Sequence, residues 1–158
     1  MTTPELTALQ AALAAEHAAV YGYGVVGGRI ADDRQDEARS AYDGHRARRD
    51  HLRRVIRDLG GTPQPAAAAY TLPFAVPDSD AAVRLATELE QRVAGVYADL
   101  VRATEGTRRG DAAAALREAA LRASGWRGGG VAFPGLAERA VPAAPSPSGS
   151  PQQTPGDH

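Results

Sequence analysis

The chain contains no cysteine and no lysine, and Met1 is its one methionine. Without cysteine it has no disulfides, no thiolate metal ligands and no thiol nucleophile, and without lysine it has no Schiff-base chemistry. The net charge of -1 argues against bulk electrostatic attraction to nucleic acid or to a membrane surface. No apolar run reaches membrane-spanning length and the N-terminus lacks a signal-peptide pattern, so we expect a cytoplasmic protein.

Aromatic residues are scarce at 5%, whereas hydrophobic residues reach 43% and many of these are alanine. Because alanine is the best helix former, this composition favours an all-α protein. A length of 158 residues is enough for one domain with its own core. Residues 141–158 are mostly Pro, Ser, Gly and Gln, so we expect a helical bundle over residues 1–140 and a disordered tail after it.

Four segments carry the helical period, at residues 4–30, 33–59, 79–104 and 107–125. Short links within the first and the last pair predict two antiparallel hairpins. Residues 60–78 are long enough, when extended, to run the full length of the bundle. Two hairpins joined by a long crossover are the ferritin-like arrangement of a four-helix bundle. The alternative is an up-down bundle with a flexible loop.

Each of the first three helices has an apolar seam with alternating three- and four-residue spacing, and each seam is broken by a polar residue near its middle. The interruptions are Glu16, His45 and Glu90. Because all three fall within about one helical turn of a helix centre, we expect them to meet at one depth in the core. Isolated charges are too costly to bury, so these side chains need partners.

The carboxylate-bridged di-metal site of this fold uses one Glu from each of two helices and a Glu-x-x-His pair from each of the others. Glu16 and Glu90 match the single-Glu positions. On the second helix His45 is present, but Tyr42 stands where the paired glutamate would be. The fourth helix offers Glu118 without a histidine three residues later, and its alanine-rich surface leaves the orientation of Glu118 open. A two-iron centre is therefore not expected.

Two interpretations of this cluster remain open. The favoured one has no cofactor: a polar network joins Glu16, His45 and Glu90 to Arg49, which lies one turn from His45, and three tyrosines edge it, namely Tyr23, Tyr42 and Tyr97. The other is a single iron or other divalent metal held by Glu16, His45 and Glu90, with water or Glu118 completing the shell.

The ordered motifs of the chain resemble those of the ferritin-like superfamily, and more closely a small bacterial ferritin-like family described as a domain of unknown function. They are the runs at 16–24 and 45–50, Tyr70-Thr71-Leu72-Pro73, Trp126-Arg127 and Phe133-Pro134-Gly135-Leu136. The resemblance spans residues 6–136 and implies the superfamily's fold. It does not carry over iron oxidation and storage, because the metal-binding pairs are broken here and fold does not fix function.

Several features outside the seams concern surfaces and partners. The arginines of the second helix indicate a solvated face rather than a nucleic-acid site, since acidic residues elsewhere balance them. His17 and His51 lie off the seams, and we expect them at the surface or an interface. Glycines at 22–28 would permit close approach of a second helix, or mark a weak helix end. Trp126 with the apolar segment 131–136 is expected to plug a bundle end, or to dock on a second subunit of a homodimer.

The sequence thus favours a ferritin-like, non-catalytic, dimeric binding or scaffold module with a degenerate metal site. The alternative is a metal-dependent oxidoreductase that uses a reduced or mononuclear Glu/His site. Neither interpretation identifies a substrate or a small-molecule ligand.

Overall fold

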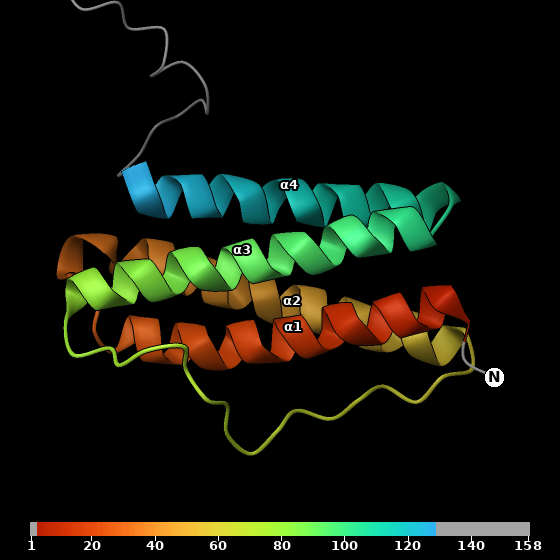
Figure 1. The fold of residues 1–158 in the computed structure, drawn as a ribbon, viewed down its shortest axis with the longest axis horizontal. Coiled ribbons are helices and arrows are strands. Elements are labelled where there is room, and N and C mark those ends of the chain that lie inside the picture. The colour runs from red at the N-terminus through yellow and green to blue at the C-terminus, as the bar shows by residue number, and fades with distance from the viewer. Residues whose placement is uncertain (1–2, 129–158) are drawn as a thin grey trace, which may run out of the picture.

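The computed structural model describes residues 3–128, and the regular secondary structure in that range is all helical (Figure 1). Its elements are α1 (Pro4–Gly27), a short 3₁₀ turn η1 (Asp32–Arg34), α2 (Gln35–Asp58), α3 (Ser79–Ala103) and α4 (Gly106–Gly128). The prediction of an all-helical bundle is confirmed. Among residues 3–128, no helix is both long and apolar enough to cross a membrane. The predicted plug at 131–136 and tail at 141–158 lie outside the described residues.

The helices form two antiparallel hairpins, α1 with α2 and α3 with α4 (Figure 1). The crossover, residues 59–78, runs back along the bundle, so α3 begins at the same end as α2 and runs parallel to it. Close backbone packing joins α1 to α2, α1 to α3, and α3 to α4. An up-down bundle would have made α2 and α3 antiparallel, and the figure shows the opposite.

Local sequence signals explain where the helices begin and end. The Thr3 hydroxyl accepts a hydrogen bond from the Leu6 amide at 3.1 Å, capping α1. Asp78 caps α3 in the same way through the Ala81 amide at 2.9 Å. After α2, Gly60 has a φ of +79°, a conformation that glycine adopts without a Cβ clash.

The connection between α1 and α2 is longer than the sequence pattern indicated, and it includes the 3₁₀ turn η1. We predicted helix to Ile30, but α1 ends at Gly27, and α2 begins at Gln35 rather than at residue 33. The Gln35 side-chain amide donates to the main-chain carbonyls of Gly27 and Ile30, both at 3.1 Å. It thereby satisfies carbonyl groups that the end of α1 leaves unpaired.

The first part of the crossover is fastened to α1 by side-chain hydrogen bonds. The Gln10 amide donates to the Thr62 carbonyl at 2.7 Å and accepts from the Gln64 amide at 3.0 Å. A ring nitrogen of His17 lies 3.0 Å from the Gln64 carbonyl. We predicted His17 at the surface or an interface, but it is buried, because the crossover covers this face of α1.

The apolar core has two parts, and the polar interruptions lie between them. One part gathers around Leu13, Ile56 and Tyr97, the other around Tyr23 and Trp126. The second part also receives the alternating apolar side chains of the crossover at positions 72, 74 and 76. The middle of the bundle is therefore occupied by the polar side chains of Glu16, His45 and Glu90.

The helices α1 and α3 approach each other closely at Gly22. A methyl group added there would lie 2.5 Å from a terminal carbon of Leu89, which is itself buried. We therefore expect Gly22→Ala to lower the free energy of unfolding by about 1 kcal/mol or more, measured by urea denaturation. Gly24→Ala is the matched control because nothing lies within 4 Å of its added carbon. It should raise stability by about 0.5–1 kcal/mol, and equal effects of the two changes would contradict this packing.

Candidate functional site

Glu16, His45 and Glu90 meet in the middle of the bundle, brought there by α1, α2 and α3. Their exposed fractions are 0%, 1% and 0%. The imidazole lies between the two acids: His45 Nδ1 is 2.6 Å from Glu16 Oε2, and Nε2 is 2.9 Å from Glu90 Oε1. The structure therefore brings together the three residues that interrupt the seams.

Aromatic side chains extend this cluster at both ends. The Tyr97 hydroxyl donates to Glu16 Oε1 and the Tyr23 hydroxyl donates to Glu90 Oε1, both at 2.6 Å. The Trp126 indole N–H donates to the Tyr23 hydroxyl at 2.9 Å. We call these six side chains the buried network: Tyr97, Glu16, His45, Glu90, Tyr23 and Trp126. It ties all four helices together by hydrogen bonds.

The hydrogen bonds of the network determine the protonation states of His45 and of the two tyrosines. Each tyrosine hydroxyl donates to a carboxylate, and each ring nitrogen of His45 also faces a carboxylate oxygen. On Glu90 the Tyr23 hydroxyl and His45 Nε2 share the same oxygen, Oε1. Burial alone would lower the pKa of His45, but the hydrogen bonds and negative charges of Glu16 and Glu90 outweigh it and raise the pKa to about 9. Burial and the adjacent carboxylates also raise the pKa of Tyr23 and of Tyr97. At neutral pH His45 is therefore an imidazolium, and both tyrosines are neutral.

Positive charge approaches the network from α4. Gly44, next to His45, leaves room for the Arg122 guanidinium, and a Cβ at this glycine would lie 2.5 Å from one of its nitrogens. The charge of Arg122 partly opposes the rise in the pKa of Tyr23. Arg122 thus places positive charge beside the part of the network that contains Tyr23. Glu90 Oε2 is buried without a hydrogen-bond partner among the described residues.

Two predicted partners do not join the network. Arg49 turns away from His45, and its Nε donates to Asp50 at 2.9 Å. At about 100° per residue, four positions carry Arg49 some 40° around α2 from His45, toward the edge of the buried face. Tyr42 is half-buried against the core, with the Arg46 guanidinium 5.6 Å from its ring centre. It makes no hydrogen bond to the network within residues 3–128.

The fourth helix fixes the orientation of Glu118, which the sequence left open, and extends further than predicted. Glu118 is exposed and accepts a hydrogen bond from Arg48 at 2.9 Å, so it does not complete the site. Trp126 lies inside α4, which continues to Gly128 rather than ending at residue 125, and its side chain is buried in the core. The inward face of α4 is formed by Ala112, Ala115, Ala119, Ala123 and Trp126. This spacing, ending on a tryptophan, was the sequence signal for Trp126.

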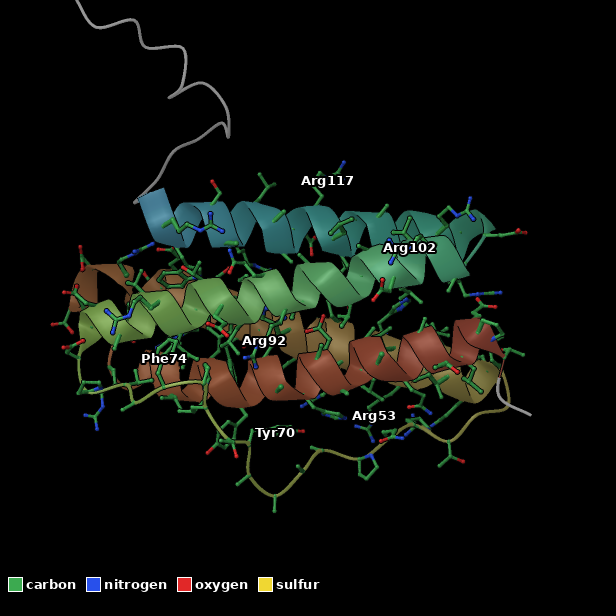
Figure 2. All side chains as sticks on the ribbon, in the orientation of Figure 1. Arg53, Tyr70, Phe74, Arg92, Arg102 and Arg117 are labelled. Atoms are coloured by element: carbon green, nitrogen blue, oxygen red, sulfur yellow. The ribbon has the colours of Figure 1, made fainter. Side chains whose placement is uncertain are left out.

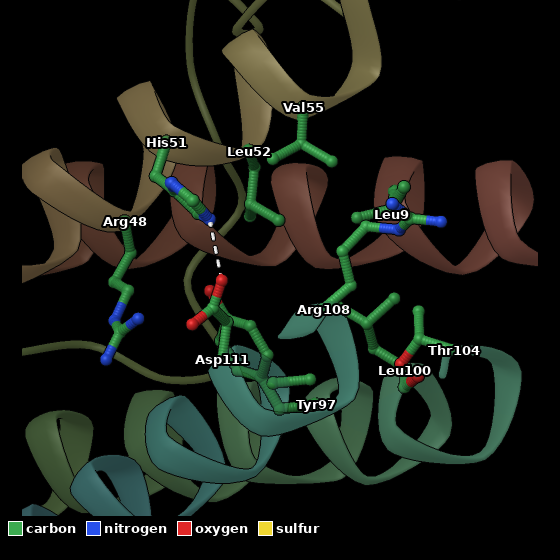
Figure 3. A pocket seen from close by; sticks show the side chains of 11 residues that line it. Leu9, Arg48, His51, Leu52, Val55, Tyr97, Leu100, Thr104, Arg108 and Asp111 are labelled. Atoms are coloured by element: carbon green, nitrogen blue, oxygen red, sulfur yellow. Dashed lines mark hydrogen bonds and ion pairs between the residues drawn. The ribbon is translucent and has the colours of Figure 1, made fainter. Parts of the chain in front are cut away.

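The two tyrosines of the network border pockets at the surface. Tyr97 lines a mainly apolar pocket between α2 and α4, where His51 and Asp111 face each other at 3.7 Å (Figure 3). His51 is thus at the surface, as predicted. Tyr23 lines a second groove, beside Gly27 and Tyr42. Glu16, Glu90 and His45 line neither pocket, so the centre of the network is enclosed, while its two tyrosines border pockets.

Comparison with known proteins places the chain among its relatives. Residues 8–138 match the family model described as Domain of unknown function (DUF4439). The chain belongs to this family. A solved structure that it resembles is the conserved hypothetical protein rv2844 from Mycobacterium tuberculosis, with 35% sequence identity and a TM-score of 0.77. The match covers 78% of this chain and 95% of that one. No curated protein matches the sequence.

Whether Glu16, His45 and Glu90 could bind a metal ion depends on the lone pairs that their side chains can offer. A metal-bound histidine offers a lone pair on a neutral ring nitrogen. Here both nitrogens of His45 lie within hydrogen-bond distance of carboxylates, which favours two N–H donors. Within residues 3–128, no group of three or more His, Asp or Glu side chains is arranged to hold a metal ion. The arrangement therefore does not fit a metal centre.

Proposed function

We propose that this chain is a ferritin-like helical bundle that acts as a non-catalytic binding or scaffold module, with the buried network in place of a metal centre. The observation that carries the proposal is the engagement of both ring nitrogens of His45 by carboxylates. An imidazolium held in this way has no lone pair with which to bind a metal ion.

Two further observations support the ferritin-like part of the proposal. The two hairpins and the long crossover match the one-crossover topology of that class (Figure 1). Glu16, His45 and Glu90 also stand near mid-helix, where that class builds its metal sites from inward-facing side chains. A network of hydrogen bonds that joins all four helices at this position gives them one specific packing, which suits a rigid binding frame.

Metal analysis after reconstitution tests the proposal. Protein purified without a histidine tag is incubated with iron, manganese or zinc, desalted and analysed for metal. We expect well below one ion per chain for each metal. About one ion per chain in the wild type, lost in Glu16→Gln, would contradict the proposal.

That contrary result would support the second candidate, a metal-dependent oxidoreductase with a mononuclear site. One observation favours it: Glu90 Oε2 is buried without a partner among residues 3–128, and a cation would satisfy it. Binding would require His45 to lose a proton and to break a hydrogen bond with a carboxylate. The non-catalytic module needs neither change, so we favour it.

The homodimer stays a prediction. Its main support is the apolar segment with Val131, Phe133 and Leu136, which lies outside the described residues.

A further inference from the structure

A basic cleft lies between α2 and the first part of the crossover. Arg49, Arg53 and Arg57 line it from α2, His17 from α1, and residues 63–66 from the crossover. Its volume is about 340 Å³, within the range of small-molecule pockets. In Figure 2, Arg53 lies between the helices and the crossover.

The charge of this cleft is largely unbalanced. The three arginines follow one another at intervals of four residues, so they share one face of α2 and repel one another. Arg49 is partly neutralised by Asp50, and its hydrogen bond lowers the pKa of that carboxyl group. Arg53 and Arg57 form no ion pair or side-chain hydrogen bond with any other residue of the range 3–128. Two guanidinium groups are therefore available to an anion.

The opposite wall of the cleft is held in place. His17, only 7% exposed, lies 3.0 Å from the Gln64 carbonyl and donates to it. Gln10 holds the main chain on both sides, by donating to Thr62 and accepting from Gln64. Because this wall is fixed before any ligand arrives, less conformational freedom is lost on binding.

We propose that this cleft binds a small phosphate-bearing molecule. A guanidinium group presents paired N–H donors that match two phosphate oxygens, and Arg53 and Arg57, one helical turn apart, offer two such groups. The crossover confines the cleft, which favours a small ligand over an extended polymer, and the net charge of -1 is unlike that of a nucleic-acid-binding domain. The inference deepens the proposed binding role, on which it rests, by naming a ligand class.

Inorganic pyrophosphate is the probe, added to the full-length, tag-free protein in a calorimetric titration at an ionic strength of about 0.15 M. The double variant R53Q/R57Q removes the two unpaired guanidinium groups. The matched control R29Q/R117Q removes two exposed arginines elsewhere and changes the net charge equally. We expect the wild type and the control to bind alike, and R53Q/R57Q to bind at least about tenfold more weakly.

Three results would overturn the inference: no binding by the wild type at millimolar pyrophosphate, equal weakening in both double variants, or tighter binding of single-stranded RNA that pyrophosphate does not displace. Far-ultraviolet circular dichroism of both variants confirms that they are folded. The two experiments can fail independently. A protein that binds neither metal nor pyrophosphate contradicts only the proposed ligand class of the cleft, and not the proposed function. One bound metal ion per chain contradicts the proposed function whatever pyrophosphate does.

Discussion

Replacing His45 by alanine is expected to lower the free energy of unfolding by about 3–5 kcal/mol. The change leaves Glu16 and Glu90, both fully buried, without the cation that lies between them. A domain of this size is stable by only about 5–15 kcal/mol, so the variant will be close to unfolding. Urea denaturation at pH 7 measures the difference, with His51→Ala as the control. The His51 side chain is 40% exposed and its ion pair with Asp111 spans 3.7 Å, so its loss should cost less than about 1 kcal/mol.

A triple variant separates the loss of charge balance from the loss of packing. In E16Q/H45A/E90Q the cavity left by the imidazole is the same, but the buried carboxylates are gone. If uncompensated charge is the main cost, the triple variant should be more stable than His45→Ala alone. A lower free energy of unfolding for the triple variant than for His45→Ala would contradict this explanation. It would show that Glu16 and Glu90 do not destabilise the fold after the imidazole is removed.

The second large effect is a loss of stability in mild alkali. The pKa of His45 rises from 6.5 to about 9 on folding, so between these values the folded protein holds a proton that the unfolded chain releases. The resulting stabilisation is fully present below pH 6.5 and is lost as pH rises through about 9. The difference corresponds to about 3 kcal/mol.

Urea denaturation at steps between pH 6 and about 9.5 measures this loss. The variant E16Q/H45Q/E90Q is the control, because it keeps polar side chains at the three positions but has no group there that titrates in this range. Its free energy of unfolding should change by less than about 1 kcal/mol over the same interval. A wild-type curve that is flat or rises with pH would contradict a cationic His45.

The sequence was enough to predict the meeting of Glu16, His45 and Glu90. Their helices are long, and each polar residue interrupts an apolar seam whose other members must face the core. Loop lengths then determined the two hairpins and the crossover. These features depend on helical periodicity and chain reach, which a single sequence carries.

What the sequence could not supply was side-chain direction at the edge of a buried face. Arg49 lies at such an edge, and its guanidinium group pairs with the neighbouring Asp50. The four-residue spacing between His45 and Arg49 does not reveal this pairing. The alanines of α4 are so uniform that the sequence does not show which face of this helix is buried. The orientation of Glu118 and the inclusion of Trp126 in the helix therefore could not be predicted. The burial of His17 depends on the path of the crossover, which a helical pattern does not encode.

The protonation of His45 is tested most directly by nitrogen NMR of the imidazole ring in uniformly labelled protein. At pH 7 both ring nitrogens should carry a proton and show slow exchange with solvent, because both face buried carboxylates. These signals should persist until the pH approaches about 9. A ring at pH 7 with one unprotonated nitrogen, or with a nitrogen bound to a metal, would contradict the metal-free network.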